Sequence, residues 1–120
     1  KPMALFDLLV NNADRKAGHI FFDDLNHLWG IDHGLCFHVE EKLRTVIWDF
    51  AGQEIPRALL EDMDRLDGQL IKDSPQYLEL SRLIQGREIT ALRKRCQFYL
   101  KSPLFPYPPD DRRPFPWPPV

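Results

Sequence analysis

The first third of the chain begins with a continuous apolar segment, which is followed by short apolar segments separated by polar turns. Residues 3–10 are apolar on every side, which predicts a buried helix over residues 3–12 that ends near Asn11 and Asn12. Residues 13–18 are polar and contain a glycine, and are expected to form a loop. Residues 19–22 and 27–31 are short apolar runs joined by the polar residues 23–26, which predicts a β-hairpin.

The predicted hairpin relates two carboxylates that are eighteen positions apart. Asp14 lies just before the first strand, and Asp32 follows the second strand directly. Because the outer ends of a hairpin's two strands lie at the same edge, we expect both side chains to emerge at the same end of the hairpin.

The remaining apolar positions favour helices. Residues 40–50 are ambiguous, since they fit a helical stripe but include strand formers, and we predict a helix closed by Gly52. Residues 56–101 show three helical stripes, the second opened by Ser74 and Pro75. The stripes are Leu59, Met63, Leu66 and Leu70; Tyr77, Leu80 and Leu83; and Ile89, Leu92, Cys96 and Tyr99. The predicted fold class is therefore mainly α with a small β-hairpin, that is, α+β.

From residue 102 onward the composition changes, because eight of the eleven prolines lie there. Such a segment cannot continue a helix or a central strand. Its four aromatic residues favour a strap, residues 102–120, that packs back on the body through Phe105, Tyr107, Phe115 and Trp117. A free polyproline ligand for a protein partner is the alternative.

Composition limits the function classes. A chain of 120 residues supports one domain, and a net charge of −2 gives no reason to expect nucleic acid as a partner. No apolar run approaches the roughly 18 residues of a membrane span. Cys36 and Cys96 are expected to be free thiols in a reducing cytoplasm. Since the chain begins with Lys1 and a buried helix, we expect it to be the C-terminal piece of a longer protein.

The polar loops contain the residue types that phosphoryl transfer needs, which are positioning groups and charges. Asp14 suits the group that orients an incoming hydroxyl and accepts its proton, and Asp32 suits a ligand for magnesium. Lys16 could relieve charge on the transferred phosphoryl group. Arg15 is expected to hold the loop by a salt bridge or backbone contact, and Asn12 to hydrogen-bond across it.

These residues resemble a known family. Asn-x-Asp-Arg at 12–15, a short hairpin and Ile-Asp-x-Gly at 31–34 look like the catalytic and metal-binding loops of the phosphoinositide 3-/4-kinase-like branch of the protein-kinase fold. The chain further resembles an uncharacterised bacterial branch of that family. The resemblance implies a kinase-like C-terminal lobe over residues 1–101, with catalytic loop 12–19, metal loop 31–34 and helical part 56–101. It also implies ATP, Mg²⁺ and a phosphate acceptor, which can be a lipid, a protein or a metabolite.

The chain also departs from the family pattern. His19 stands five residues after Asp14, where the family has an asparagine that binds a second metal ion. Magnesium prefers oxygen ligands, so His19 as a metal ligand points towards Mn²⁺. The small lobe with its glycine-rich loop and nucleotide-contacting lysine has no counterpart in these 120 residues. We therefore expect the fragment alone to bind nucleotide weakly or not at all, and to be inactive.

Other interpretations of the same residues stay open. Both tetrapeptides occur widely as ordinary turns, and the same site could transfer an adenylyl group or survive in a catalytically degenerate, pseudokinase-like scaffold. His33, Cys36 and His38 could form a zinc site, but no second ligand pair follows at the usual spacing. The basic residues between Arg87 and Lys101 are typical of a solvated helix face.

Overall fold

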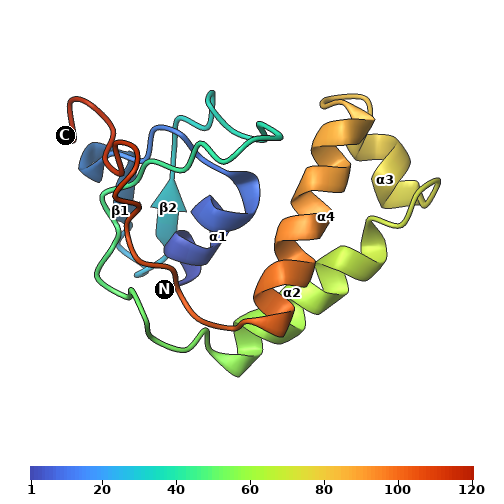
Figure 1. Ribbon diagram of the computed structural model, residues 1–120, viewed down its shortest axis with the longest axis horizontal. Helices are drawn as coiled ribbons and strands as arrows, with labels where there is room; N and C mark the ends of the chain where they lie inside the picture. The colour runs from blue at the N-terminus through green and yellow to red at the C-terminus, as the bar shows by residue number, and fades with distance from the viewer.

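The computed structural model describes residues 1–120 as a mainly helical chain with one two-stranded antiparallel sheet. This confirms the expected α+β class. The elements are α1 (Pro2–Val10), the 3₁₀ turn η1 (Ala17–His19), β1 (Ile20–Phe22), β2 (Leu28–Gly30), α2 (Arg57–Gln69), α3 (Pro75–Leu80) and α4 (Gly86–Lys101). Helix α1 and the hairpin form one side of the molecule, and α2, α3 and α4 form the other (Figure 1). None of these helices combines the length and apolar character that a membrane span requires.

Helix α1 is central because most of its surface is buried. Leu5, Leu8 and Leu9 face the core, and the helix ends where Asn11 adopts a left-handed conformation with φ of 55°. Asparagine tolerates this conformation better than most residues. The Asn11 side chain donates to the carbonyls of His38 and Glu40, which fixes the segment that follows the hairpin against the end of α1.

The predicted hairpin is present, with Phe21 opposite Trp29 and Ile20 opposite Gly30. Its turn is held by Asp23, whose carboxylate accepts hydrogen bonds from the backbone of Leu25 and His27 and from the Trp29 indole. Gly30 lies against Met3 of α1, where an added Cβ would stand 2.7 Å from the Met3 Cε. Leu28 and Gly30 of the hairpin therefore lie beside α1, while Phe21 and Trp29 are about half exposed.

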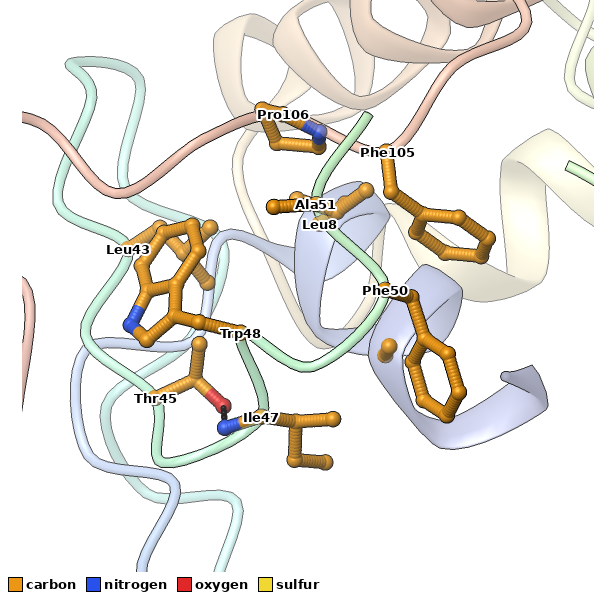
Figure 2. A pocket seen from close by; sticks show the side chains of 10 residues that line it. Leu8, Leu43, Thr45, Ile47, Trp48, Phe50, Ala51, Phe105 and Pro106 are labelled. Carbon is orange, nitrogen blue, oxygen red and sulfur yellow. Dashed lines mark hydrogen bonds between the residues drawn. The ribbon is translucent and has the colours of Figure 1, made fainter. Parts of the chain in front are cut away.

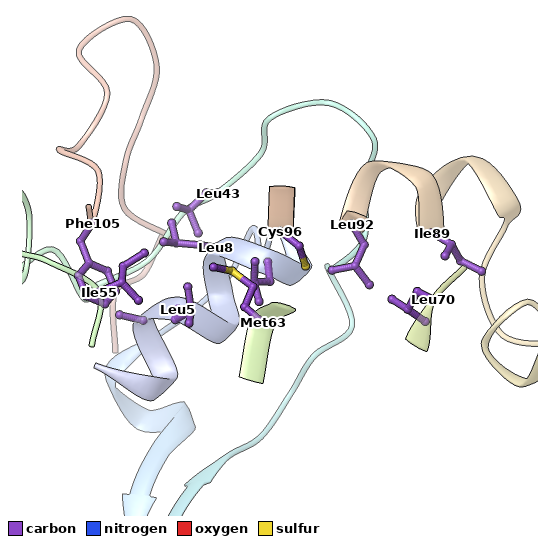
Figure 3. Packing of buried hydrophobic residues seen from close by; sticks show 12 residues of the cluster. Leu5, Leu8, Leu43, Ile55, Met63, Leu70, Ile89, Leu92, Cys96 and Phe105 are labelled. Atoms are coloured by element: carbon purple, nitrogen blue, oxygen red, sulfur yellow. The ribbon is translucent and has the colours of Figure 1, made fainter. Parts of the chain in front are cut away.

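The helical half forms as its apolar stripes predict. Met63 and Leu70 of the α2 region and Ile89, Leu92 and Cys96 of α4 are buried, and Met63 lies beside α1 in the shared core (Figure 3). The Ser74 side chain accepts a hydrogen bond from the Tyr77 backbone, as expected for the residue that opens α3. Leu83 is the exception, because α3 ends at Leu80 and Leu83 is exposed.

The helix predicted over residues 40–50 is wrong. No helix forms there, because the backbone of this segment bonds to neighbours far away in the sequence. Arg44 donates to the Asn12 carbonyl, Thr45 to Pro114 and Val46 to Arg15. These pairings are strand-like and suit the β-branched residues Thr45 and Val46. Gly52, expected to close a helix, instead forms a turn with φ of 77°.

Residues 102–120 run back along the outside of the body towards the hairpin end (Figure 1). Phe105 is buried, and with Pro106 it lines a small apolar pocket with Leu8 and Trp48 (Figure 2). Pro116 is also fully buried. The expectation that all four aromatic side chains pack inward is wrong for Tyr107 and Trp117, which are exposed, while Phe115 is half-exposed.

Candidate metal and phosphate site

Three side chains from two loops converge at the base of the hairpin. One ligand atom from each of Asp14, His19 and Asp32 lies within 4.8 Å of the other two. Asp14 and Asp32 therefore lie together at one edge, as the hairpin arrangement predicts. The ligand atoms of these three side chains are close enough to one another to bind a single metal ion together.

Asp14 is held by the loop that follows α1. Its backbone N–H donates to the Asn12 side-chain oxygen over 2.9 Å, so the loop turns back on itself at this point. The neighbouring Ala13 N–H donates to the carbonyl of Leu35, beyond the hairpin. The Asp14 carboxylate stays partly exposed, and the Lys16 ammonium lies 3.7 Å from it. Asp14 and Lys16 thus present one negative and one positive group on the same loop.

His19 ends the short η1 turn, and its ring is fixed by the backbone around it. The ring Nδ1 lies 3.3 Å from the Lys16 N–H and 3.1 Å from the Asp14 carbonyl. The opposite nitrogen, Nε2, lies 3.5 Å from an oxygen of Asp32. A histidine whose second nitrogen contacts a backbone carbonyl has the arrangement common among metal-binding imidazoles.

Asp32 follows β2 after Ile31, whose N–H donates to the His19 carbonyl and extends the hairpin by one bond. The backbone of Asp32 is left-handed, with φ of 60°. This conformation is uncommon for residues other than glycine, although aspartate and asparagine tolerate it. It turns the chain sharply after the strand, and the Asp32 side chain remains exposed at the surface of the site.

Arg15 lies beneath this cluster and is completely buried. Its guanidinium pairs with the buried carboxylate of Asp7 on α1, with Nε 2.9 Å from Oδ2. Its Nη1 contacts the carbonyls of His19 and Ile31, and its Nη2 lies 2.8 Å from the His33 ring. Arg15 therefore contacts both segments that present metal ligands.

Arg15 and Asn12, both named as site residues from the sequence, are positioning residues. Each is fully buried, so neither reaches a bound molecule. Asn12 donates to Asp7 through its side-chain nitrogen and accepts from the Asp14 backbone, which connects the buried pair to the loop. Asp7 was not predicted as a site residue, although a single acidic residue inside the apolar run of residues 3–10 is a signal for a buried ionic partner.

The candidate zinc ligands do not come together. His33 contacts Arg15, and the His38 Nδ1 accepts from the Glu40 backbone over 3.0 Å. Burial, with the Asp7 charge nearby, raises the pKa of the Cys36 thiol to about 11. None of the three side chains belongs to the group that lies within reach of a single ion.

The donor set of Asp14, His19 and Asp32 suits a divalent cation. Two carboxylates provide the oxygen ligands that Mg²⁺ and Mn²⁺ prefer, and the imidazole adds a nitrogen ligand. A single Lys16 balances the two carboxylates within the loop, so the local charge favours a cation. In the hairpin, Ile20 and Gly30 form the pair of residues nearest the cluster, and Phe21 and Trp29 form the next pair. The Phe21 and Trp29 side chains are both about half exposed.

Comparison with known proteins shows a similarity that extends over almost the whole chain. Over 118 residues, the chain is 47% identical to Protein Rv2133c of Mycobacterium tuberculosis (strain ATCC 25618 / H37Rv), and the match covers 98% of this chain and 41% of that protein. The chain thus spans about two fifths of the relative's length. No protein-family model and no solved structure matches the chain.

Proposed function

We propose that this chain forms the catalytic and metal-binding part of an ATP- and Mg²⁺-dependent phosphotransferase of kinase-like fold. One observation carries the proposal: the carboxylates of Asp14 and Asp32 and the His19 ring lie within 4.8 Å of each other. The two motifs that resemble kinase loops are thereby brought to one place. A hairpin by itself brings its two outer ends together, so the support for the proposal lies in the donor set, two carboxylates and an imidazole within reach of one ion.

The proposed roles follow from exposure and position. Asp14 is partly exposed beside Lys16, so it can accept a proton from an acceptor hydroxyl while Lys16 balances charge on the phosphoryl group. Asp32, the most exposed of the three, would be the chief metal ligand, with His19 as the second. The cation supplies charge neutralisation for the nucleotide phosphates when it is bound. Arg15 and Asp7 keep the two loops in place from below.

The exposed side chains of Phe21 and Trp29 add support for a nucleotide. Residues opposite one another in an antiparallel pair project on the same face, so this face of the hairpin presents two exposed aromatic side chains. Aromatic surfaces bind nucleobases by stacking, at about 1–3 kcal/mol per base. In the proposed enzyme this surface contributes to the nucleotide site, and the part of the protein outside residues 1–120 completes it.

The test is turnover of radiolabelled ATP by the longer protein that contains this chain. We expect release or transfer of the γ-phosphate with Mg²⁺ or Mn²⁺, and its loss in Asp14→Asn and Asp32→Asn with folding intact. Asp24→Asn, an exposed carboxylate in the hairpin turn, is the matched control. Label that follows the α-phosphate would instead assign adenylyl transfer. Activity retained in both site variants would contradict the roles assigned to Asp14 and Asp32.

A further inference from the structure

The end of the C-terminal strap lies against the loop that carries the proposed metal ligands. The Ala17 N–H donates to the Pro119 carbonyl over 3.0 Å, although the two residues are far apart in the sequence. In Figure 1 the C-terminal segment lies close to the short turn that precedes β1. The strap therefore contacts the loop directly at Ala17, between Lys16 and His19.

The strap also forms hydrogen bonds with residues 45–48. The Pro114 carbonyl accepts from the Thr45 N–H over 3.0 Å and from the Trp48 indole over 3.2 Å. The segment that carries Thr45 is itself paired with the loop, because Arg15 exchanges backbone hydrogen bonds with Arg44 and Val46. The strap, residues 44–46 and the loop are consequently joined side by side by backbone hydrogen bonds.

The η1 turn (Ala17–His19) is held at both ends by these contacts. Pro119 binds its first residue, and the Arg15 guanidinium contacts the carbonyl of its last residue, His19, over 3.4 Å. Gly18 between them has open space around it and no packing of its own. Nothing packs on the middle of the turn. The His19 ring is oriented by its Nδ1 contacts with the backbone of Lys16 and Asp14, and the two anchoring contacts hold the turn that carries this ring.

We propose that the strap is a positioning element of the metal site, in which the Pro119 carbonyl holds the η1 turn so that His19 Nε2 faces Asp32. This inference rests on the proposed function for the identity of the site. It extends that proposal by assigning a role to residues 114–120, which contribute no ligand themselves. Groups that orient a metal-binding histidine typically change metal affinity by about 10- to 100-fold when removed.

The sharpest test is Ala17→Pro, which removes the N–H that donates to Pro119. Lys16 has an extended conformation, with φ of −99° and ψ of 158°, which a following proline favours. Proline is also well tolerated at the first position of a helical turn. Gly18→Ala is the matched control, since an added Cβ meets nothing within 4 Å. Deletion of residues 117–120 removes the acceptor carbonyl and provides a second, independent variant.

The measurement is Mn²⁺ affinity by calorimetry, combined with NMR of the His19 ring nitrogens. We expect Ala17→Pro and the deletion each to weaken Mn²⁺ binding by about tenfold or more, to broaden or shift the His19 ring signals without metal, and to leave Gly18→Ala unchanged. In a His19→Ala background the same two changes should have no further effect, because they act through that ring.

Three results would overturn the inference. Wild-type affinity in both strap variants would contradict it while leaving the proposed function intact. A loss that adds fully to that of His19→Ala would assign the strap a merely structural role. If the wild-type protein binds no Mn²⁺, the proposed function and this inference fail together, and the NMR signals then show only whether the strap orders the ring.

Discussion

The guanidinium of Arg15 and the carboxylate of Asp7 form a completely buried, bidentate pair directly beneath the candidate metal site. Nε and Nη2 of Arg15 both donate to Asp7 over 2.9 to 3.1 Å. Since Arg15 also contacts the carbonyls of His19 and Ile31, the pair connects helix α1 to both ligand-bearing segments. The buried Arg15–Asp7 pair therefore holds the two segments that carry the candidate metal ligands in position.

This pair gives the first prediction. Asp7→Ala leaves the Arg15 charge buried without its partner, so we expect a loss of about 3–5 kcal/mol in the free energy of unfolding, measured with urea. The double variant Asp7→Leu with Arg15→Met should recover most of that stability, because it removes both charges. It should still lose metal affinity, since the guanidinium that contacts the carbonyls of His19 and Ile31 is then absent. A loss below about 1 kcal/mol in Asp7→Ala would contradict the assigned role.

Gly52 and Gly68 give a second prediction with opposite signs. Gly52 has φ of 77°, and an added Cβ would lie 2.3 Å from the Tyr107 hydroxyl, so Gly52→Ala should destabilise the protein by about 1 kcal/mol or more. Gly68 lies within α2 with nothing near it, so Gly68→Ala should stabilise by about 0.5–1 kcal/mol. Thermal unfolding of the two variants checks both signs. If both substitutions changed the melting temperature by the same amount in the same direction, the turn geometry at Gly52 would be contradicted.

Asp23 gives a prediction about acid. The hydrogen bond from the Trp29 indole, followed by that from the His27 backbone, lowers the pKa of Asp23 below its ordinary value of 3.8. A lowered pKa means that the stabilisation of the hairpin turn is complete above about pH 4 and is lost as pH falls through the lower, folded value. NMR of the Trp29 indole proton should show this transition below pH 3.8. A midpoint at or above 3.8, or no change in Asp23→Asn, would contradict the contact.

The two cysteines lead to a prediction about stability and thiol reactivity at alkaline pH. Burial raises the pKa of Cys36 and of Cys96 to about 11 in each case. Because the neutral thiols are favoured in the folded state, their stabilising effect is present below the unfolded pKa of about 8.5 and is lost as pH rises towards about 11. At about pH 8, near the unfolded thiol pKa, we expect slow reaction of both thiols with a disulfide reagent in native protein and fast reaction in urea. Rapid reaction in the native protein would contradict the burial of Cys96 and the raised pKa of the partly buried Cys36 thiol.

Local patterns were sufficient for much of the fold. The stripe of Leu59, Met63 and Leu66 predicts α2, because a helix that buries one face needs only its own spacing. The hairpin is predictable because its two strands and its turn are adjacent in the sequence. Residues 40–50 were not, since their hydrogen-bond partners are Asn12, Arg15 and Pro114, and sequence spacing does not reveal partners so far away.

The candidate site shows the same division. Asp14 and Asp32 could be named from motif order and the hairpin between them, and His19 from the family resemblance. The three side chains lie within one ion's reach. The buried support could not be deduced in the same way. The pairing of Asp7 with Arg15, the contact of Arg15 with His33 and the bond from Ala17 to Pro119 depend on how separate segments pack.

The most direct test of the metal site is pulsed electron paramagnetic resonance of Mn²⁺ added to the protein. We predict one bound Mn²⁺ per chain, with a coupled ¹⁴N nucleus that disappears in His19→Gln, and binding that is lost in Asp32→Asn. The control is Asp24→Asn, which should leave both the stoichiometry and the nitrogen signal unchanged. Absence of a bound ion, or unaltered binding in Asp32→Asn, would contradict the claim that Asp14, His19 and Asp32 form one metal site.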